Sequence, residues 1–301
     1  MSGMSKIVEC VPNFSEGRNL ERIEKIVQPF RGRDRVKLLD YQRDEDHNRL
    51  VVTVVGEPGP LKEAVLEAMG VAVAAIDLRS HQGQHPRMGA VDVVPFIPVR
   101  NVTMPEAIEL SRQVAAAAAE KLGLPVFLYE ESAAAPHRKN LADIRKGQFE
   151  GMPEKLKQPE WVPDFGPVAV HPSAGVTAVG ARMALVAYNV NLGTSELNIA
   201  NDIARKVRHL GGGLRYCKAI GIDLKERGIV QVSMNMTDYT RTALYRAFEL
   251  IRIEAQRWGV PVVGSEIVGL VPMAALIDTA AYYLQLEGFK TKQVLESRIY
   301  E

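Results

Sequence analysis

The stretch HQGQHPRMGAVD occupies residues 81–92, between apolar segments at residues 71–76 and 93–99. A loop this polar between two core elements must lie at a surface or line a cleft. Its position therefore decides how the elements before and after it are arranged. The loop combines two histidines, an arginine and an aspartate with two glycines and a proline. Histidine titrates closest to neutral pH, so His81 and His85 are the first candidates for moving protons. We interpret the rest of the chain as the frame that holds this loop.

The segments on either side of the loop alternate between strand and helix patterns. Apolar spacing predicts strands at residues 7–11, 36–41, 49–55, 93–99 and 125–129, and helices at about 20–27, 60–76 and 104–122. The order β-α-β-β-α-β, followed by one more α-β, favours helices on one face of a mainly antiparallel sheet. Pro95 and Pro98 indicate that their strand lies at an edge or carries a bulge.

Residues 136–178 differ from the rest in composition, being rich in proline and glycine and locally basic. Within them we expect a short helix at residues 140–147. Connections this long are usually functional or are linkers. Small residues at 164–175 allow a flat, aromatic-sized ligand to approach the backbone closely. The same residues also suit a rigid interdomain hinge, and the sequence leaves both readings open.

The second half of the chain repeats the pattern of the first. We expect strands at residues 183–191, 216–224, 230–236 and 261–267, and helices at 195–209, 239–258 and 272–284. The order β-α-β-β-α-β therefore recurs. We predict an α+β chain of two similar subdomains, residues 1–178, which include the proline-rich linker, and residues 179–301. Two similar units usually face each other and leave a cleft between them.

Composition excludes several functional classes. The 301 residues are 47% hydrophobic and 24% charged, with a formal net charge of +1, which argues against a nucleic-acid binder with a large basic surface. No apolar run reaches membrane-spanning length, since the longest, residues 270–284, contains Asp278. The two cysteines, Cys10 and Cys217, form no disulfide framework, so we expect a reducing cytoplasm.

His81 and His85 are four residues apart, a spacing that places two metal ligands on one face of a helix. Gly83 and Pro86 disfavour a helix here, and no cysteine or carboxylate stands at a familiar zinc spacing. We therefore expect no metal. A plain structural reading stays open, in which a histidine caps the loop and Arg87 pairs with Asp92.

Several longer blocks carry a family resemblance. ECVPNFSEG (9–17), HPRMGA (85–90), PFIPV (95–99), EKLKQ (154–158), DFGP (164–167), PVVGS (261–265) and VGLVP (268–272) occur in the order expected for the glutamate formimidoyltransferase family. The match runs from about residue 6 to residue 285 and covers both repeats. Long blocks in register are a specific signal, and the chain resembles that family over most of its length.

The resemblance implies a fold, an activity and partners. The fold is two tandem ferredoxin-like (βαββαβ) sandwich subdomains, and the protein is a homodimer. The activity is transfer of a formimidoyl group between 5-formimidoyltetrahydrofolate and L-glutamate, which links histidine degradation to one-carbon metabolism. Tetrahydrofolate takes part as a substrate and product, with no metal.

The resemblance also implies site residues. The catalytic histidine of the HPRMG block is His85. The folate-contacting segment corresponds to Gly166, Pro167, Val168, Ala169, Val170, His171, Pro172, Ser173, Ala174 and Gly175. This segment departs from animal members, which carry an aromatic residue before the glycine.

The implied chemistry suits these residues. An amine attacks an amidine carbon, the incoming nitrogen loses a proton, and N5 of the folate gains one as it departs. A histidine near its ordinary pKa serves both steps, and we assign them to His85. Arg87 or Arg49 holds a glutamate carboxylate by a bidentate contact. Asp92 or Asp40 orients the imidazole.

Other functions compete with this prediction. The nearest is a formyltransferase that uses 5-formyltetrahydrofolate on the same scaffold. A non-catalytic folate-binding protein belongs to a different class, and a metal-dependent hydrolase is a third, weaker option.

Overall fold

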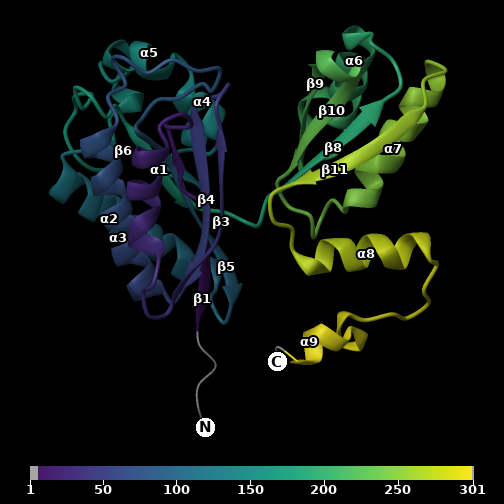
Figure 1. Ribbon diagram of the computed structural model, residues 1–301, viewed down its shortest axis with the longest axis horizontal. Coiled ribbons are helices and arrows are strands. Elements are labelled where there is room, and N and C mark those ends of the chain that lie inside the picture. Colours follow the sequence, from purple (N-terminus) through teal and green to yellow (C-terminus); the bar gives the residue numbers. More distant parts are fainter. Residues whose placement is uncertain (1–5, 300–301) are drawn as a thin grey trace. The chain divides into compact units, whose positions relative to one another are not determined.

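The computed structural model describes residues 6–299, which form two compact units (Figure 1). Unit 1 extends to Arg182, and unit 2 begins at Met183. The expected boundary after residue 178 falls inside strand β7 (Thr177–Ala181), which is paired on both sides within unit 1. Each unit has its own sheet and core, so the prediction of a mixed α/β chain with two sheets is confirmed at that level.

Unit 1 begins with the predicted β-α-β-β-α-β order. Its elements are β1 (Ile7–Cys10), β2 (Asn13–Phe14), α1 (Leu20–Val27), a 3₁₀ turn (Gln28–Phe30), β3 (Val36–Asp44), β4 (Arg49–Gly56), α2 (Pro58–Ala75) and β5 (Val91–Arg100). Strands β1 and β2 both lie between β4 and β5, and β3 pairs with the far side of β4. All of these pairings are antiparallel. The chain directly after Pro12 therefore stays in the sheet as β2.

The remaining strands of unit 1 extend its sheet beyond β5. Helix α3 (Met104–Leu122) leads to β6 (Val126–Glu130), and β7 enters between β5 and β6, parallel to both. Strand β7 comes about fifty residues after β6 along the chain. The proline-rich stretch therefore leaves the sheet after β6 and returns to it between β5 and β6.

Helices α1, α2 and α3 cover one face of this sheet (Figure 1). Alternate residues of β4, Leu50, Val52 and Val54, are fully buried against them, because successive side chains of a strand point to opposite faces. Helix α1 begins at the cap Asn19, whose Oδ1 accepts a hydrogen bond from the backbone N–H of Arg22 over 3.0 Å. Because the helices cover one face of the sheet, functional side chains of its strands can lie only on the other face or at the ends of the strands.

Strand β5 corrects the prediction that its prolines mark an edge. It lies inside the sheet, paired with β1 and β2 on one side and with β7 on the other. The register of β1 against β5 shifts between Ile7 and Val8, opposite Pro98, so the bulge alternative holds near that proline. A proline is tolerated inside a sheet where pairing is locally irregular, since it has no N–H to donate.

The stretch from 136 to 161 packs on the opposite face of the sheet. Its elements are a 3₁₀ turn (Pro136–Arg138), α4 (Leu141–Arg145), α5 (Gln148–Lys155) and a second 3₁₀ turn (Pro159–Trp161). The short helix expected near residue 140 is present as α4. Ile144, Met152 and Leu156 form a separate small core with Phe127 and Tyr129 of β6. The expected linker is therefore a folded layer of unit 1.

Unit 2 repeats the order with one sheet and two helices on one face. Its elements are β8 (Val186–Leu192), α6 (Leu197–Val207), β9 (Cys217–Leu224), β10 (Ile229–Met236), α7 (Leu244–Arg257) and β11 (Val262–Val268), with 3₁₀ turns at His209–Gly211 and Lys225–Arg227. The strands lie in the order β11-β8-β10-β9, all antiparallel. The closing elements are α8 (Met273–Tyr283), a 3₁₀ turn (Thr291–Gln293) and α9 (Leu295–Ile299).

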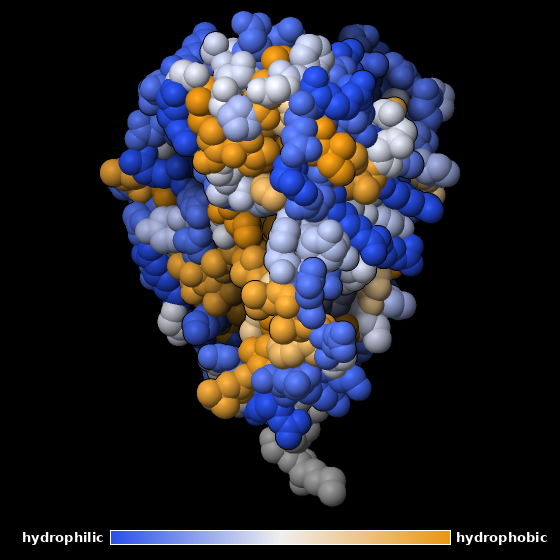
Figure 2. All heavy atoms as spheres, turned by 90° about the vertical axis from the view of Figure 1, so that its right-hand side faces the viewer, coloured by the Kyte–Doolittle hydropathy of each residue, from blue (hydrophilic) through white to orange (hydrophobic). Residues whose placement is uncertain are grey.

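Helix α8 leaves much of its apolar surface uncovered. The exposed large apolar side chains on it and just after it are Met273, Leu276, Tyr282, Tyr283 and Leu284. Figure 2 views the molecule from the side on which α7 and α8 lie in Figure 1, and shows apolar surface in a broken band between hydrophilic borders. Within residues 6–299, no helix is both long and apolar enough to span a bilayer.

Candidate functional site

The histidine loop leaves α2 and enters β5, and hydrogen bonds fix it to the β3–β4 hairpin. The backbone N–H of His85 donates to the carbonyl of His47 over 3.4 Å, and that of Gln84 donates to the carbonyl of Asp46 over 3.1 Å. Gly83 allows this approach, since a Cβ there would lie 2.3 Å from the His47 carbonyl oxygen. The hairpin therefore sets the place of His85 before any side chain is considered.

His85 is almost wholly buried, at 4% exposure, beside the fully buried Asp92 of β5. Its Nε2 lies 3.3 Å from Oδ2 of Asp92, and the backbone N–H of Met88 donates to Oδ1 over 2.9 Å. Arg145 contacts the same Oδ2 through Nη2. Burial opposes the charge of Asp92, but Arg145, His85 and the Met88 N–H outweigh it and hold the pKa of Asp92 below its usual value.

The protonation state of His85 follows from these neighbours. Burial lowers its pKa most, Asp92 raises it, and Arg145 and Arg49 lower it, with a net shift below the ordinary value of 6.5. The imidazole is therefore neutral at pH 7. Because an ionised carboxylate only accepts hydrogen bonds, the proton lies on Nε2 and is donated to Asp92. Nδ1 makes no hydrogen bond to any residue in the described part of the chain, so its lone pair is available for accepting a proton.

Asp40, the other carboxylate predicted to orient the imidazole, lies elsewhere. It is on β3, where Nε2 of Gln42 donates to it over 3.0 Å at an exposed position. Asp92 is therefore the carboxylate that the structure brings to His85.

Arg145 is a site residue that sequence reasoning did not single out. It ends the five-residue helix α4, which begins at the cap Asn140. The Lys155 ammonium group donates to the carbonyls of Asp143, Ile144 and Lys146 at the end of this helix, and burial lowers the pKa of Lys155 to about 8. No pattern in the sequence could reveal Arg145, because only the folding of α4 against the sheet brings it to Asp92.

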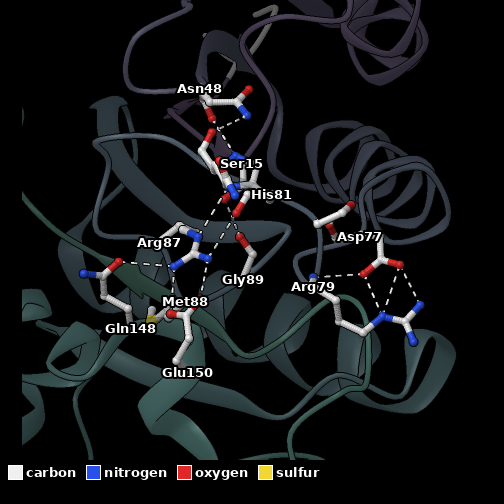
Figure 3. A network of polar contacts seen from close by, with 12 residues as sticks. Ser15, Asn48, Asp77, Arg79, His81, Arg87, Met88, Gly89, Gln148 and Glu150 are labelled. Carbon is white, nitrogen blue, oxygen red and sulfur yellow. Dashed lines mark hydrogen bonds and ion pairs between the residues drawn. The ribbon is translucent and has the colours of Figure 1, made fainter.

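Arg87 is paired away from Asp92, so the alternative reading with an Arg87–Asp92 ion pair is wrong. Its Nη1 lies 2.9 Å and its Nη2 2.6 Å from the two carboxylate oxygens of Glu150 on α5, while Nη1 also donates to Gln148 (Figure 3). Arg87 as a whole is 7% exposed. Of the two arginines predicted to hold a substrate carboxylate, Arg87 already has a bidentate partner and the Arg49 side chain has none among the described residues.

His81 uses both ring nitrogens within the loop (Figure 3). Its Nε2 lies 3.0 Å from the carbonyl oxygen of Asn48 and must carry the proton, so Nδ1 accepts from Nε of Arg87 at 3.3 Å. Burial lowers the pKa of His81. Of the two histidines in the loop, His81 serves to anchor Arg87, and His85 is the one with a free nitrogen.

The segment predicted to contact folate lies directly against the histidine loop. Residues 171–175 form a tight turn, closed by backbone bonds between His171 and Gly175. The N–H of Ala90 donates to the carbonyl of Ala174 over 2.8 Å, and Gly89 bridges to Gly175. Residues 166–169 are exposed, and residues 174 and 175 are buried. The structure therefore brings this segment and the His85 loop together, although they lie far apart in the sequence.

Gly175 meets a strict requirement at this junction, and its replacement by alanine should destabilise unit 1. Its φ is +73°, and a Cβ would lie 2.2 Å from the Met88 carbonyl oxygen. Strain at positive φ and the backbone clash together should lower the free energy of unfolding by more than about 1 kcal/mol. Gly32→Ala is the matched control, because Gly32 has φ +64° with nothing within 4 Å. If urea unfolding shows that both variants lower the free energy of unfolding equally, the contact with Met88 is unimportant.

The cysteines do not belong to the site around His85. Cys10 and Cys217 are both free and buried, and burial raises the pKa of each thiol. Across residues 6–299, no three His, Cys, Asp or Glu side chains are grouped so as to hold a metal ion.

Two family models together match nearly the whole chain. One, described as "Formiminotransferase domain, N-terminal subdomain", matches residues 7–182, and the other, described as "Formiminotransferase domain", matches residues 187–298. The matched segments correspond to unit 1 and unit 2.

Individual relatives agree with this match. The chain is 54% identical to glutamate formimidoyltransferase of Streptococcus pyogenes serotype M1, over 98% of this chain and 99% of that protein. It is 46% identical to glutamate formimidoyltransferase of Thermoplasma acidophilum, over 97% of each chain. It is also 47% identical to formimidoyltransferase-cyclodeaminase of Rattus norvegicus, over 94% of this chain but only 53% of that longer protein.

Proposed function

Because the chain belongs to the formiminotransferase family, we propose that it transfers a formimidoyl group between 5-formimidoyltetrahydrofolate and L-glutamate, with His85 moving the proton. Two relatives that match nearly its whole length are glutamate formimidoyltransferases, and the chain is an enzyme of that activity. The roles of its individual residues are part of the same proposal.

The observation that carries the role of His85 is its pairing with Asp92. The carboxylate fixes the tautomer with the proton on Nε2 and leaves Nδ1 as a base. Burial keeps the imidazole neutral at pH 7. An imidazole held in this way resembles the His–carboxylate pairs of other acyl-transfer enzymes, in which the carboxylate orients the base and stabilises its protonated form.

The chemical steps use one proton carrier. The amino nitrogen of glutamate attacks the formimidoyl carbon on N5 of the folate, and a tetrahedral centre forms as the new C–N bond is made. Nδ1 of His85 removes the proton from the incoming nitrogen. The imidazolium then delivers it to N5 as the N5–C bond breaks, which releases tetrahydrofolate and N-formimidoyl-glutamate. The proton is returned, so the enzyme ends each cycle in its starting state.

The position of the segment 166–175 supports a role in folate binding. Its buried end forms backbone hydrogen bonds to the His85 loop through Ala90, and its other end, residues 166–169, is exposed. A pterin that contacts the exposed part would hold N5 near the loop that carries the base. Gly166 is held at the start of this exposed part by packing, because a Cβ there would lie 2.2 Å from the carbonyl oxygen of Leu124.

The strand order supports the finer fold assignment that we propose. In both units, the elements β-α-β-β-α-β form a sheet in which the first strand lies between the third and the fourth. This is the order of the ferredoxin-like arrangement. We also propose that the protein works as a homodimer, for which the uncovered apolar surface of α8 is a candidate interface, and that it acts in histidine degradation in the cytoplasm.

A turnover assay with purified protein tests the proposed function. The protein is mixed with L-glutamate and either 5-formimidoyl- or 5-formyltetrahydrofolate, and the release of tetrahydrofolate is measured over time. We expect release from the formimidoyl donor that requires glutamate. If tetrahydrofolate is released from the formyl donor alone, the protein is a formyltransferase with the same fold. Folate binding with no release from either donor would overturn the function and leave a binding protein.

A further inference from the structure

The surroundings of Asp92 carry more positive than negative charge. Arg145 contacts Oδ2 of Asp92, and Arg49, at the start of β4, lies close enough for Arg145, Asp44 and Asp92 to affect its charge. His85 is neutral, so the two guanidinium groups have the buried carboxylate of Asp92 between them and the carboxylate of Asp44 near Arg49. Asp44, which is paired with Arg49 across the β3–β4 hairpin, is half exposed and lies with its Oδ2 at 2.8 Å from Nδ1 of His47. On the buried side of this cluster, among the described residues, two guanidinium groups therefore share the carboxylate of Asp92.

The donors of the two arginines show where a further anion would lie. The Arg49 side chain makes no hydrogen bond or ion pair with any other residue between 6 and 299, and its Nε is buried without a partner. Nε of Arg145 is likewise buried and unpartnered. Burial, and then the neighbouring Arg145, lower the pKa of Arg49. A buried guanidinium donor without an acceptor is costly, and a bound carboxylate would satisfy both arginines.

We propose that Arg49 and Arg145 bind the α-carboxylate of the amino-acid acceptor beside His85, an inference that rests on the proposed transfer to glutamate. Arg145 and His85 contact the same oxygen of Asp92, so guanidinium and imidazole lie within two hydrogen-bond lengths of each other. In an α-amino acid, the carboxylate nearest to the reacting nitrogen is the α-carboxylate. A substrate whose amine reaches His85 therefore presents that group to the arginines.

The arginines would also assist the chemistry. The amine must lose its proton before it attacks, and a free amino acid holds that proton partly because its own carboxylate is negative. Two guanidiniums that neutralise the carboxylate lower the pKa of the neighbouring ammonium group. A larger fraction of the bound amino acid then carries the neutral amine that attacks, and Nδ1 of His85 stays available for the proton of the incoming nitrogen. Arginine suits this task because its planar fork binds a carboxylate through two donors.

The test compares two acceptors that differ only at the group in question. L-Isoglutamine carries a carboxamide in place of the α-carboxylate, and kcat/KM for it and for L-glutamate is measured with 5-formimidoyltetrahydrofolate at saturation. The wild-type enzyme should prefer glutamate by at least about 100-fold. Arg145→Met and Arg49→Met should each lower kcat/KM for glutamate by about 10- to 100-fold. Arg49→Met should change kcat/KM for isoglutamine little. Arg145 also contacts Asp92, so Arg145→Met should lower kcat/KM for isoglutamine as well, but by less than for glutamate. The preference for glutamate therefore shrinks in both variants.

Controls separate this inference from general effects. Lys146→Met removes the same charge from the exposed neighbour of Arg145 and should leave the preference intact. If Arg145→Met fails to fold, Arg49→Met carries the test, since its side chain has no partner to lose among the described residues.

Three outcomes would overturn the inference while the transfer activity stands. These are equal use of both acceptors by the wild type, equal loss with both acceptors in the arginine variants, and a Lys146→Met effect as large as theirs. Absence of any turnover with glutamate in the wild type would instead reject the proposed function, and the inference with it.

Discussion

Replacing His85 by asparagine should lower kcat by about 10²- to 10⁴-fold, the usual contribution of general acid–base catalysis. Asparagine keeps a polar group that can donate to Asp92, but it has no basic nitrogen in place of Nδ1. Because His85 is 4% exposed and its ring hydrogen-bonds only to Asp92 among the described residues, the change should disturb the surrounding loop little. The loss should therefore appear in kcat, measured by tetrahydrofolate release.

Folate affinity serves as the control for His85→Asn. The affinity of His85→Asn for 5-formyltetrahydrofolate, measured by calorimetry, should stay within a few-fold of the wild-type value. The matched variant His209→Asn, at an exposed histidine, should keep a kcat within a few-fold of the wild-type value. Near-normal kcat in His85→Asn with folate still bound would remove His85 from the mechanism. Loss of folate binding together with activity would point to a structural role.

Asp92→Asn should lower kcat on the order of 10²- to 10⁴-fold for a different reason. The amide can donate to Nε2, which favours the tautomer that carries its proton on Nδ1. Nδ1 then already carries a proton and cannot accept one from the substrate. Arg145 also loses its buried partner, so the free energy of unfolding should fall by about 3–5 kcal/mol. The rate should therefore be expressed per folded molecule, with folding checked by circular dichroism.

The residual activity of Asp92→Asn carries a second signature in its pH profile. Activity requires neutral His85, so kcat/KM falls as the pH drops through the pKa of His85. Asp92 raises that pKa, and its removal should move the acidic limb to still lower pH. Asp40→Asn, on an exposed part of β3, should change neither rate nor limb. An unshifted limb in Asp92→Asn would contradict the electrostatic contact between Asp92 and His85.

Strongly periodic elements were predictable because local sequence determines them. Helix α3 was expected at residues 104–122 and is found as Met104–Leu122, with Thr103 and Glu106 forming a capping box that closes its first turn. The excursion at 136–178 was not predictable as a layer of unit 1. Its place depends on β7 pairing in parallel with β5 and β6, a non-local contact that leaves no periodic signal.

The site was predictable in its parts but not in its pairings. The composition of residues 81–92 indicated a proton-transfer loop, and the family resemblance selected His85 and the segment 166–175. The partner of Arg87 could not be inferred, because Glu150 lies sixty-three residues away and reaches it only through the fold of α5. For the same reason Arg145 appeared in the sequence as one charge in a basic run.

The central claim is that His85 stands ready as a neutral base with its proton on Nε2. Nitrogen-15 NMR of histidine-labelled protein tests this directly, with the His85 signals identified by their absence from His85→Asn. The account predicts that, at pH 7, Nε2 of His85 is protonated and Nδ1 is not, and that the ring titrates below pH 6.5. A His85 that carries its proton on Nδ1, or that is positively charged at pH 7, would contradict it.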